Sequence, residues 1–109
     1  MILYGIMTCD GCRKARRALA GARFEDIREL DDLKDRLPAW HAAAGPRLVN
    51  KSSKTWRTLS DADKARAASD TVALLAEHPT LIKRPVIERD GEVFVGWTPA
   101  VRAALGVAD

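Results

Sequence analysis

The sequence predicts an α/β fold in which helices flank a mixed four-stranded sheet. Two observations carry this prediction. The first is a strand–helix–strand unit at the N-terminus, where two short apolar runs enclose a helical pattern. The second is a hairpin near the C-terminus, where Asp90-Gly91 separates two runs of strand-forming residues. Helical patterns fill the interval between the two units, so one sheet built from both, with helices on its faces, accounts for the whole chain.

A chain of 109 residues is expected to form a single domain over residues 1–109. The content of 47% hydrophobic and 30% charged residues is typical of a globular protein. The net charge of +3 suits an anionic small molecule or an acidic partner, and we expect no direct binding to nucleic acid. No apolar run could cross a membrane and no signal-peptide pattern is present, so we expect a cytoplasmic location without membrane contact.

The first two strands are predicted over residues 2–6 and 23–28. The first run is too short for a helix and is rich in branched and aromatic residues, and Phe24 and Ile27 are the main apolar residues of the second. A helix is expected between them, with Gly21 as a plausible stop signal. Its expected inner face is formed by Ala15, Ala18, Leu19 and Ala22.

The middle of the chain is predicted to be helical. Apolar residues recur at helical spacing at Leu30, Leu33, Leu37, Trp40 and Ala44. Pro38 interrupts this pattern, so we expect a kink, or a short turn that feeds a helix ending at Gly45-Pro46. Ser60 has the character of an N-cap and opens an alanine-rich helix, and a further helical segment ends at His78-Pro79.

The C-terminal part is predicted to form a hairpin and a last helix. Arg84 precedes a proline and is biased towards extended backbone, and Pro85 fits the first position of a strand. The hairpin then runs over residues 86–95 with a two-residue type I′ turn. Thr98 is expected to cap a helix that has Pro99 at its first position. The expected inner face of this helix is Val101, Ala104 and Leu105, and its stop signal is Gly106.

Cys9, at the junction between the first predicted strand and the first predicted helix, is the expected reactive residue. The first amides of a helix lack internal partners and carry partial positive charge, so the pKa of a cysteine at that point falls. Basic residues are unfavourable early in a helix, and a nearby thiolate or anionic ligand would offset that cost. Four such residues follow within two turns: Arg13, Lys14, Arg16 and Arg17. We therefore predict redox chemistry at Cys9.

Cys12 has two interpretations that the residues leave open. The Cys-x-x-Cys spacing allows a disulfide with little strain, so Cys12 could resolve a mixed disulfide formed at Cys9. Alternatively Cys12 is simply buried, since free cysteine is among the most buried residue types. A zinc site would need His41 and His78 as well, and these lack the close pair spacing of known sites, so no metal is expected.

The polar loop at residues 51–57 also has two interpretations. It contains Lys51, Lys54 and Trp56. It is either a surface loop pinned by a packed tryptophan or an anion-contacting loop near the active site. The residues alone do not decide between these alternatives.

Several motifs spread over nearly the whole chain match a known family. They are Leu3-Tyr4-Gly5-Ile6, Cys12-Arg13-Lys14-Ala15, Thr55-Trp56-Arg57 with Leu59, Ile82-Lys83-Arg84-Pro85, and Val95-Gly96. On these motifs the chain resembles the arsenate reductase (ArsC)/Spx/YffB family, and most closely its YffB-type branch. The resemblance implies a thioredoxin-like fold with a helical insertion, at about residues 46–79, before the C-terminal hairpin.

The resemblance also implies a site. Cys9 would be the nucleophile, Cys12 a resolving cysteine, and Arg84 would reach back to the cysteine loop beside Pro85, a proline that is cis in thioredoxin-like folds. For YffB-type members it implies a glutathione-dependent thiol reductase with no tightly bound cofactor. Glutathione would be the co-substrate, and the partner a small thiol or disulfide, or a protein disulfide. The groups expected to bind glutathione carboxylates or an oxyanion are Arg13, Lys14, Lys51, Lys54 and Arg84, with Pro85 beside them.

The family implies two alternative functions. One is arsenate reduction, and the other is redox sensing of the Spx kind, in which a disulfide between the two cysteines switches a surface that binds RNA polymerase. One departure weighs against the first alternative. The family commonly has an arginine two residues after the asparagine matched by Asn50, and here that residue is Ser52, flanked by lysines. Lysine does not reproduce the bidentate fork of arginine, and no further arginine has an evident match after the hairpin.

Overall fold

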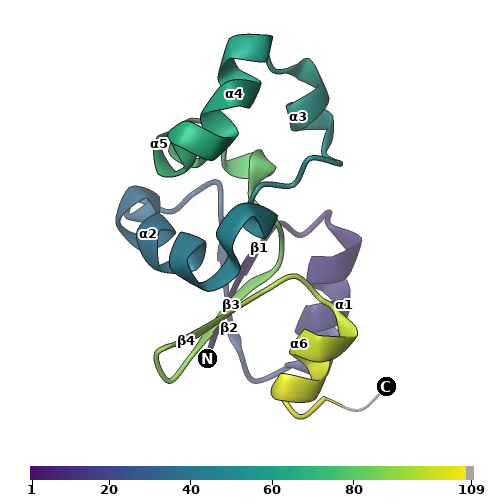
Figure 1. Cartoon of the computed structure of the whole chain (residues 1–109). Helices are drawn as coiled ribbons and strands as arrows, with labels where there is room; N and C mark the ends of the chain where they lie inside the picture. The colour runs from purple at the N-terminus through teal and green to yellow at the C-terminus, as the bar shows by residue number, and fades with distance from the viewer. Residues whose placement is uncertain (108–109) are drawn as a thin grey trace.

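Four strands form one mixed sheet in the order β2-β1-β3-β4 in the computed structural model, which describes residues 1–107 (Figure 1). The strands are β1 (Ile2–Gly5), β2 (Arg23–Asp26), β3 (Val86–Arg89) and β4 (Glu92–Val95). β1 and β2 are parallel, and the other two neighbouring pairs are antiparallel. The predicted mixed four-stranded sheet is confirmed.

The two faces of the sheet are covered by different helices. The side chains of Leu3 and Ile87, which pair across β1 and β3, form a small core with α1 (Asp10–Ala18) and the segment around α6 (Pro99–Ala104). Their neighbours along the strands point to the other face and join the main core under α2 (Leu33–Ala44). This alternation is the two-residue period of a strand. Figure 1 shows α1 and α6 side by side, with α2 across the sheet from them.

Three further helices gather at one end of the molecule, away from the hairpin (Figure 1). They are α3 (Lys54–Thr58), α4 (Asp61–Ser69) and α5 (Thr71–Glu77), and two short 3₁₀ helices, η1 (Gly45–Leu48) and η2 (Pro79–Leu81), border them. Leu74 and Leu75 of α5 are fully buried in the main core. The oxygen of Ser60 accepts a hydrogen bond from the amide of Asp63, so the predicted cap of α4 is confirmed.

The hairpin turn has the geometry that its sequence predicts. Asp90 has a φ of 51° and Gly91 a φ of 83°, and the flanking residues Arg89 and Glu92 pair directly. Two successive positive φ values define the type I′ turn, which matches the twist of the strands it joins. The last helix also begins as expected, because the oxygen of Thr98 accepts a hydrogen bond from the amide of Val101.

Two expected element boundaries are wrong. α1 ends at Ala18, before Gly21, because Leu19 leaves helical backbone geometry, with φ −115° and ψ 55°, and its carbonyl accepts a hydrogen bond from the amide of Ala22 at 2.9 Å. β2 ends at Asp26, whose carboxylate accepts a hydrogen bond from the Arg28 amide and turns the chain. α2 continues through Pro38, which is exposed, so the alternative of a short turn at this residue is wrong, and the helix ends at Ala44 with Gly45 as its C-cap, as expected.

Two residues expected on inner helix faces are exposed. Ala18 lies on the flank of α1 that looks towards α6, and the buried face of α1 is formed by Cys12, Ala15 and Leu19. Ala104 of α6 is likewise exposed, while Val101 is buried. In both helices the apolar period is too short to fix the inner face to better than one residue.

Candidate active site at the cysteine turn

Cys9 is the N-cap residue of α1. Its backbone is extended, with φ −82° and ψ 125°, and its carbonyl accepts the hydrogen bond from the Arg13 amide that begins the helix, at 3.0 Å. Its own amide donates to the carbonyl of Ile6 at 3.0 Å, which closes the turn after β1. The side chain is half-buried and packs against the main core. The Cys9 sulfur is therefore held where the free amides of the first helical turn converge.

The environment of Cys9 favours its thiolate. Partial burial opposes ionisation, but the nearby backbone amides of Cys12 and Gly11 favour the charged form. The neighbouring thiol of Cys12 and the positive charge of Arg84 act in the same direction. These contributions outweigh burial, and the pKa of Cys9 lies below its ordinary value of 9.0.

Cys12 has the opposite environment. It is completely buried on the inner face of α1, one helical turn beyond Cys9. Burial, together with the thiolate-bearing Cys9 beside it, raises the pKa of the Cys12 thiol to about 12. Both cysteines are free thiols in this structure. The two sulfurs of one Cys-x-x-Cys motif thus differ strongly in acidity.

Gly5 makes room for the Cys12 sulfur. A Cβ atom at Gly5 would lie 2.5 Å from Cys12 Sγ and 3.1 Å from its Cβ, closer than real atoms approach. Sequence reasoning used this glycine only as part of a motif. A glycine inside a strand pattern is nevertheless a signal for close approach of another group to the backbone, and that signal could have found it.

The segment Arg84-Pro85 contacts the first turn of α1. The peptide bond between these residues is cis, as the family resemblance implied. A Cβ at Gly11 would lie 3.8 Å from Pro85 Cδ and 3.9 Å from the carbonyl oxygen of Arg84, so the two segments touch through the backbone of Gly11. The charge of Arg84 acts on both cysteines and on the carboxylate of Asp26. Residues 75 positions apart in the sequence (9 and 84) are thereby brought into one site.

The guanidinium of Arg84 has one buried donor without a partner. Its Nε atom is the only buried side-chain nitrogen or oxygen in residues 1–107 that has no hydrogen-bond partner. No carboxylate in this part of the chain forms an ion pair with Arg84. An unsatisfied buried donor costs free energy, and in a native protein it calls for an explanation such as a bound group. An anionic ligand beside Cys9 would supply the missing acceptor.

A short ladder holds the segment that carries Arg84. The amide of Lys83 donates to the carbonyl of Leu48 at 2.7 Å, and the amide of Asn50 donates to the carbonyl of Leu81 at the same distance. On the other side, the amide of Gly96 donates to the carbonyl of Pro85 at 2.8 Å. The approach to the cysteine turn is therefore fixed by main-chain bonds on both sides, and no pattern in the sequence indicated the bonds to residues 48–50.

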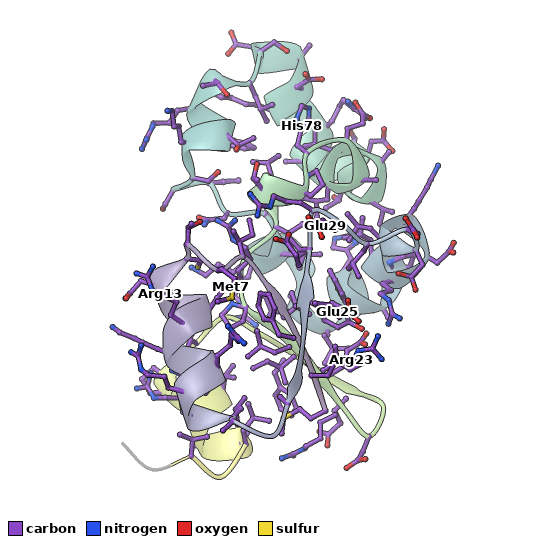
Figure 2. The ribbon with its side chains drawn as sticks, turned by 180° about the vertical axis from the view of Figure 1, so that it is seen from behind. Met7, Arg13, Arg23, Glu25, Glu29 and His78 are labelled. Atoms are coloured by element: carbon purple, nitrogen blue, oxygen red, sulfur yellow. The ribbon has the colours of Figure 1, made fainter. Side chains whose placement is uncertain are left out.

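Arg13 and Lys14 lie on the exposed side of α1 close to Cys9. Lys14 Nζ is 3.1 Å and Arg13 Nη2 is 3.8 Å from the carboxylate of Asp10. Figure 2 shows Arg13 and Met7 at the same end of α1, around the cysteine turn. The exposed positions of both basic residues leave them open to a ligand that approaches Cys9.

The lysines of the 51–57 loop have other neighbours. Lys51 Nζ lies 5.5 Å, and Lys64 Nζ 5.8 Å, from the ring centroid of Trp56, and both lysines line a separate cavity of about 320 Å³. Lys54 is exposed at the start of α3. Trp56 packs against the main core, as the interpretation of a surface loop pinned by a tryptophan requires. The structure provides no contact between this loop's lysines and the cysteines.

Trp97 is a neighbour of the site that the sequence did not single out. It is half-buried, and its Cβ lies 4.0 Å from a Cβ built at Gly11. Together with Lys14 and Arg102 it lines a groove of about 520 Å³ between α1 and α6. Arg102 donates to the carbonyl of Trp97 at 3.1 Å. The only sequence signal that could have indicated this residue is a tryptophan shortly after a strand.

Residues 1–107 contain neither a group of metal ligands nor a helix suited to a membrane. No three histidine, cysteine, aspartate or glutamate side chains are grouped so that they could hold a metal ion. No helix in this part of the chain combines the length and apolar character needed to span a membrane.

The chain as a whole is similar to known proteins. The model of the ArsC family matches residues 4–104. An uncharacterized protein of Haemophilus influenzae is 40% identical over 102 residues, which cover 87% of this chain and 89% of that protein. The global transcriptional regulator Spx 2 of Bacillus cereus is 25% identical over 105 residues, covering 89% of this chain and 79% of the regulator.

Solved structures show the same fold. A YffB protein superposes with a TM-score of 0.83 at 34% identity, covering 94% of this chain and 96% of its own. An arsenate reductase (ArsC) related protein from Brucella melitensis superposes with a TM-score of 0.68 at 32% identity, covering 94% of this chain and 91% of that protein. The expected thioredoxin-like arrangement of ArsC-type proteins is confirmed.

Proposed function

The chain belongs to the ArsC family, and on this premise we propose that it is a thiol reductase in which Cys9 is the nucleophile and glutathione supplies the electrons. The fold is that of thiol reductases of this family, and redox chemistry is the general activity that the family's arsenate reductase-related members indicate. The identity of the reductant and the roles of the single residues are the proposal.

The difference in acidity between the two cysteines is the observation that carries this proposal. The pKa of Cys9 is lowered and that of Cys12 is raised to about 12, so Cys9 forms its thiolate at lower pH than Cys12 does. The thiolate, not the thiol, attacks a disulfide. A nucleophile at the accessible helix start and a protonated thiol buried behind it are the arrangement that a two-step exchange requires.

The proposed reaction is a series of thiol–disulfide exchanges. The Cys9 thiolate attacks one sulfur of the substrate disulfide, the substrate S–S bond breaks, and the other substrate sulfur leaves as a thiolate. Cys12, after loss of its proton, or a glutathione thiolate then attacks the Cys9 sulfur of the mixed disulfide, and the second substrate sulfur leaves as a thiolate. Cys9 is now in a disulfide with Cys12 or with glutathione, and further glutathione thiolates reduce this disulfide, so that Cys9 is restored and glutathione disulfide is released. Two glutathione molecules are oxidised to one glutathione disulfide for each substrate disulfide reduced, so electrons balance.

Arg84 is proposed to bind a carboxylate of glutathione or of the substrate. Its buried Nε lacks a partner and its charge already acts on Cys9. A carboxylate would give a charge-assisted hydrogen bond to this nitrogen. Arg13 and Lys14 at the exposed rim of the turn are proposed to assist. A cytoplasmic location follows from this proposal, because glutathione keeps thiols reduced there.

A coupled assay tests this function. The protein is given bis(2-hydroxyethyl) disulfide with glutathione, glutathione reductase and NADPH, and NADPH oxidation is followed. We expect turnover in the wild type, none in Cys9→Ser, and partial turnover in Cys12→Ser, in which glutathione alone resolves the mixed disulfide. Absence of turnover in the wild type, or full turnover in Cys9→Ser, would refute the proposal.

Arsenate reduction is the second candidate, favoured by the likeness to an arsenate reductase related protein at 32% identity. Arg84 could contact an oxyanion, but Ser52 replaces the arginine expected after Asn50, and Lys51 is engaged with Trp56 instead. NADPH oxidation that depends on arsenate in the same coupled assay would favour this candidate over disulfide reduction.

A redox-sensing role is the third candidate, favoured by the likeness to an Spx regulator at 25% identity. Such a role needs a switch between dithiol and disulfide but no turnover. Binding of this protein to RNA polymerase that depends on the oxidation state of the two cysteines, without reduction of small disulfides, would favour this candidate.

A further inference from the structure

A groove runs along one flank of α1 from the cysteine turn to the end of the helix. Its volume is about 400 Å³. Arg13, Arg16 and Arg17 line it together with Met7, and Leu3 and Leu19 contribute apolar surface. The nine residues of α1 extend over about 13 Å, which equals the length of about four residues of extended peptide. The groove therefore has the size for a short peptide segment that leads to Cys9.

The groove is basic, and its lining contains no acidic residue. Asp10, the only acidic residue of α1, pairs with Lys14 and, at 3.8 Å, with Arg13 of the groove. Within residues 1–107, Arg16 and Arg17 form no ion pair with a carboxylate. Both residues lie in the last turn of α1, where the helix dipole favours positive charge, so their charge is available to an anionic partner along this flank.

Arg16 is held in place rather than solvated freely. Its Nη1 donates to Met7 Sδ at 2.7 Å, and its guanidinium carbon lies 4.7 Å from the ring centroid of Phe24 on β2. A thioether is a weak acceptor and a guanidinium has five N–H donors, so most of the donors of Arg16 remain open to a ligand. A side chain fixed in this way loses less entropy on binding than a free arginine.

Met7 adds an exposed apolar contact two residues before Cys9. Its side chain is 46% exposed, which makes it one of two large apolar side chains in residues 1–107 that are openly exposed. Methionine is flexible and polarisable, and it adapts to different apolar partners. Figure 2 shows Met7 next to the N-terminal turn of α1. The mouth of the groove thus combines an apolar anchor with the reactive sulfur.

We propose that this α1 groove binds an acidic segment, containing an apolar side chain, of a protein whose disulfide is the substrate of Cys9. This inference rests on the proposed thiol reductase function and names its substrate class. The acidic residues of the partner segment would contact the arginines of the groove. Its apolar side chain would contact Met7, Leu3 and Leu19. Cys9 attacks the partner's disulfide, whose S–S bond breaks with release of one partner thiolate, and two glutathiones supply the electrons that complete the cycle.

Two matched peptide disulfides test the proposal. Both are cysteine peptides in mixed disulfide with glutathione. In one the residues next to the cysteine are acidic around a central leucine, and in the other they are basic around the same leucine. The readout is kcat/KM in the coupled assay, divided by that for bis(2-hydroxyethyl) disulfide. We expect the normalised kcat/KM of the acidic peptide to exceed that of the basic peptide by roughly tenfold at low salt. This ratio should shrink at a salt concentration of about 0.5 M, where the screening length is roughly 4–5 Å.

Charge reversal locates the effect. Arg17→Glu should remove most of the acidic preference, whereas Arg57→Glu, the same change at an exposed position of α3, should leave it intact. An acidic preference that survives Arg17→Glu would overturn the assignment to this groove. Equal rates for the two peptides would overturn it as well, although the small disulfide is still reduced. Inhibition by a DNA oligonucleotide as strong as that by a non-reactive acidic leucine peptide would also overturn it, because the groove would then attract any polyanion.

No reduction of any disulfide, the small one included, would instead refute the proposed function itself.

Discussion

At the scale of single residues, the close contact between Gly5 and Cys12 shapes the site. The sulfur of Cys12 occupies the place of a side chain that Gly5 lacks. This contact sets how deeply α1 sits on β1, and therefore where Cys9 lies at the helix start. The sequence alone indicated a reactive Cys9 from its place between a strand and a helix. It gave no account of why Cys12 is inaccessible, because that depends on a glycine seven positions earlier.

Gly5→Ala tests this contact. The added methyl group would lie 2.5 Å from Cys12 Sγ, and overpacking of this kind lowers the free energy of unfolding by about 1–3 kcal/mol. Urea unfolding of the variant measures the loss. Gly21→Ala is the matched control, because that position is exposed and nothing lies within 4 Å of the added atom. The double variant Gly5→Ala/Cys12→Ala should recover part of the loss. A Gly5→Ala protein as stable as the Gly21→Ala protein would contradict the packing described.

Arg84 could be placed near Cys9 only through the family resemblance. Its position before a proline predicts extended backbone but not its neighbours. In the structure its charge acts on both cysteines, and its Nε is buried without a partner. An unsatisfied donor is a property of the folded environment, so no sequence pattern could have indicated it.

At the scale of secondary-structure elements, one carboxylate of the sheet forms hydrogen bonds with α2. Glu88 on β3 accepts hydrogen bonds from Tyr4 Oη on β1 at 2.7 Å, from Arg36 Nη1 at 3.1 Å and from Trp40 Nε1 at 3.0 Å, the last two on α2. Tyr4 and Trp40 are fully buried, so both depend on this acceptor. The apolar period predicted α2 and its inner face, but it could not indicate that a charged residue on a strand would satisfy them.

Glu88→Ala should therefore lower the free energy of unfolding by about 3 kcal/mol, since it leaves two buried donors without partners. Glu88→Gln keeps the shape and one acceptor and should lose less. The control is Glu92→Ala on the hairpin, whose side chain is 64% exposed and 3.9 Å from Arg89, and whose loss should cost less than about 0.5 kcal/mol. Equal unfolding midpoints in urea for Glu88→Ala and Glu92→Ala would show that the carboxylate does not anchor α2.

Element boundaries were predicted less well than the elements themselves. α1 and β2 both end early, because the carbonyl of Leu19 accepts a hydrogen bond from the Ala22 amide and the carboxylate of Asp26 accepts one from the Arg28 amide, and both bonds turn the chain. These are local tertiary effects that override propensity. Turns and caps with strong chemistry of their own, such as Asp90-Gly91 and Thr98, were predicted correctly.

At the scale of the whole molecule, the order of strands and helices could be predicted from the sequence. The main-chain bonds between residues 48–50 and residues 81–83 could not. The ladder between residues 48–50 and 81–83 holds both the approach to Arg84 and the start of the 51–57 loop. It joins segments more than thirty residues apart with only one isolated bridge between them, and it leaves no periodic signal in the sequence.

Stability of the whole molecule should fall at alkaline pH because of Cys12. Its pKa is raised from 9.0 to about 12 on folding, so above pH 9 the unfolded chain loses this proton while the folded one keeps it. This contribution is fully present below pH 9 and is lost as the pH rises towards 12. Between pH 8 and pH 10 the wild type should lose about 1 kcal/mol more than Cys12→Ala does.

Urea unfolding of both proteins under reducing conditions measures this difference. Titrating groups other than Cys9, whose pKa depends on the Cys12 thiol, cancel because the two proteins share them. An identical pH dependence of the two proteins would mean that Cys12 is accessible to water.

The central claim is that Cys9, poised by the first amides of α1 and by Arg84, is the thiolate of this site. The most direct measurement is the rate of iodoacetamide labelling of each cysteine as a function of pH, resolved by peptide mapping, in the wild type and in Arg84→Ala. Cys9 should be labelled first, with a midpoint below pH 9.0, and Cys12 should stay unlabelled near neutral pH. Arg84→Ala should raise the midpoint of Cys9 labelling. Labelling of Cys12 before Cys9, or a Cys9 midpoint at or above 9.0 that does not respond to Arg84→Ala, would contradict it.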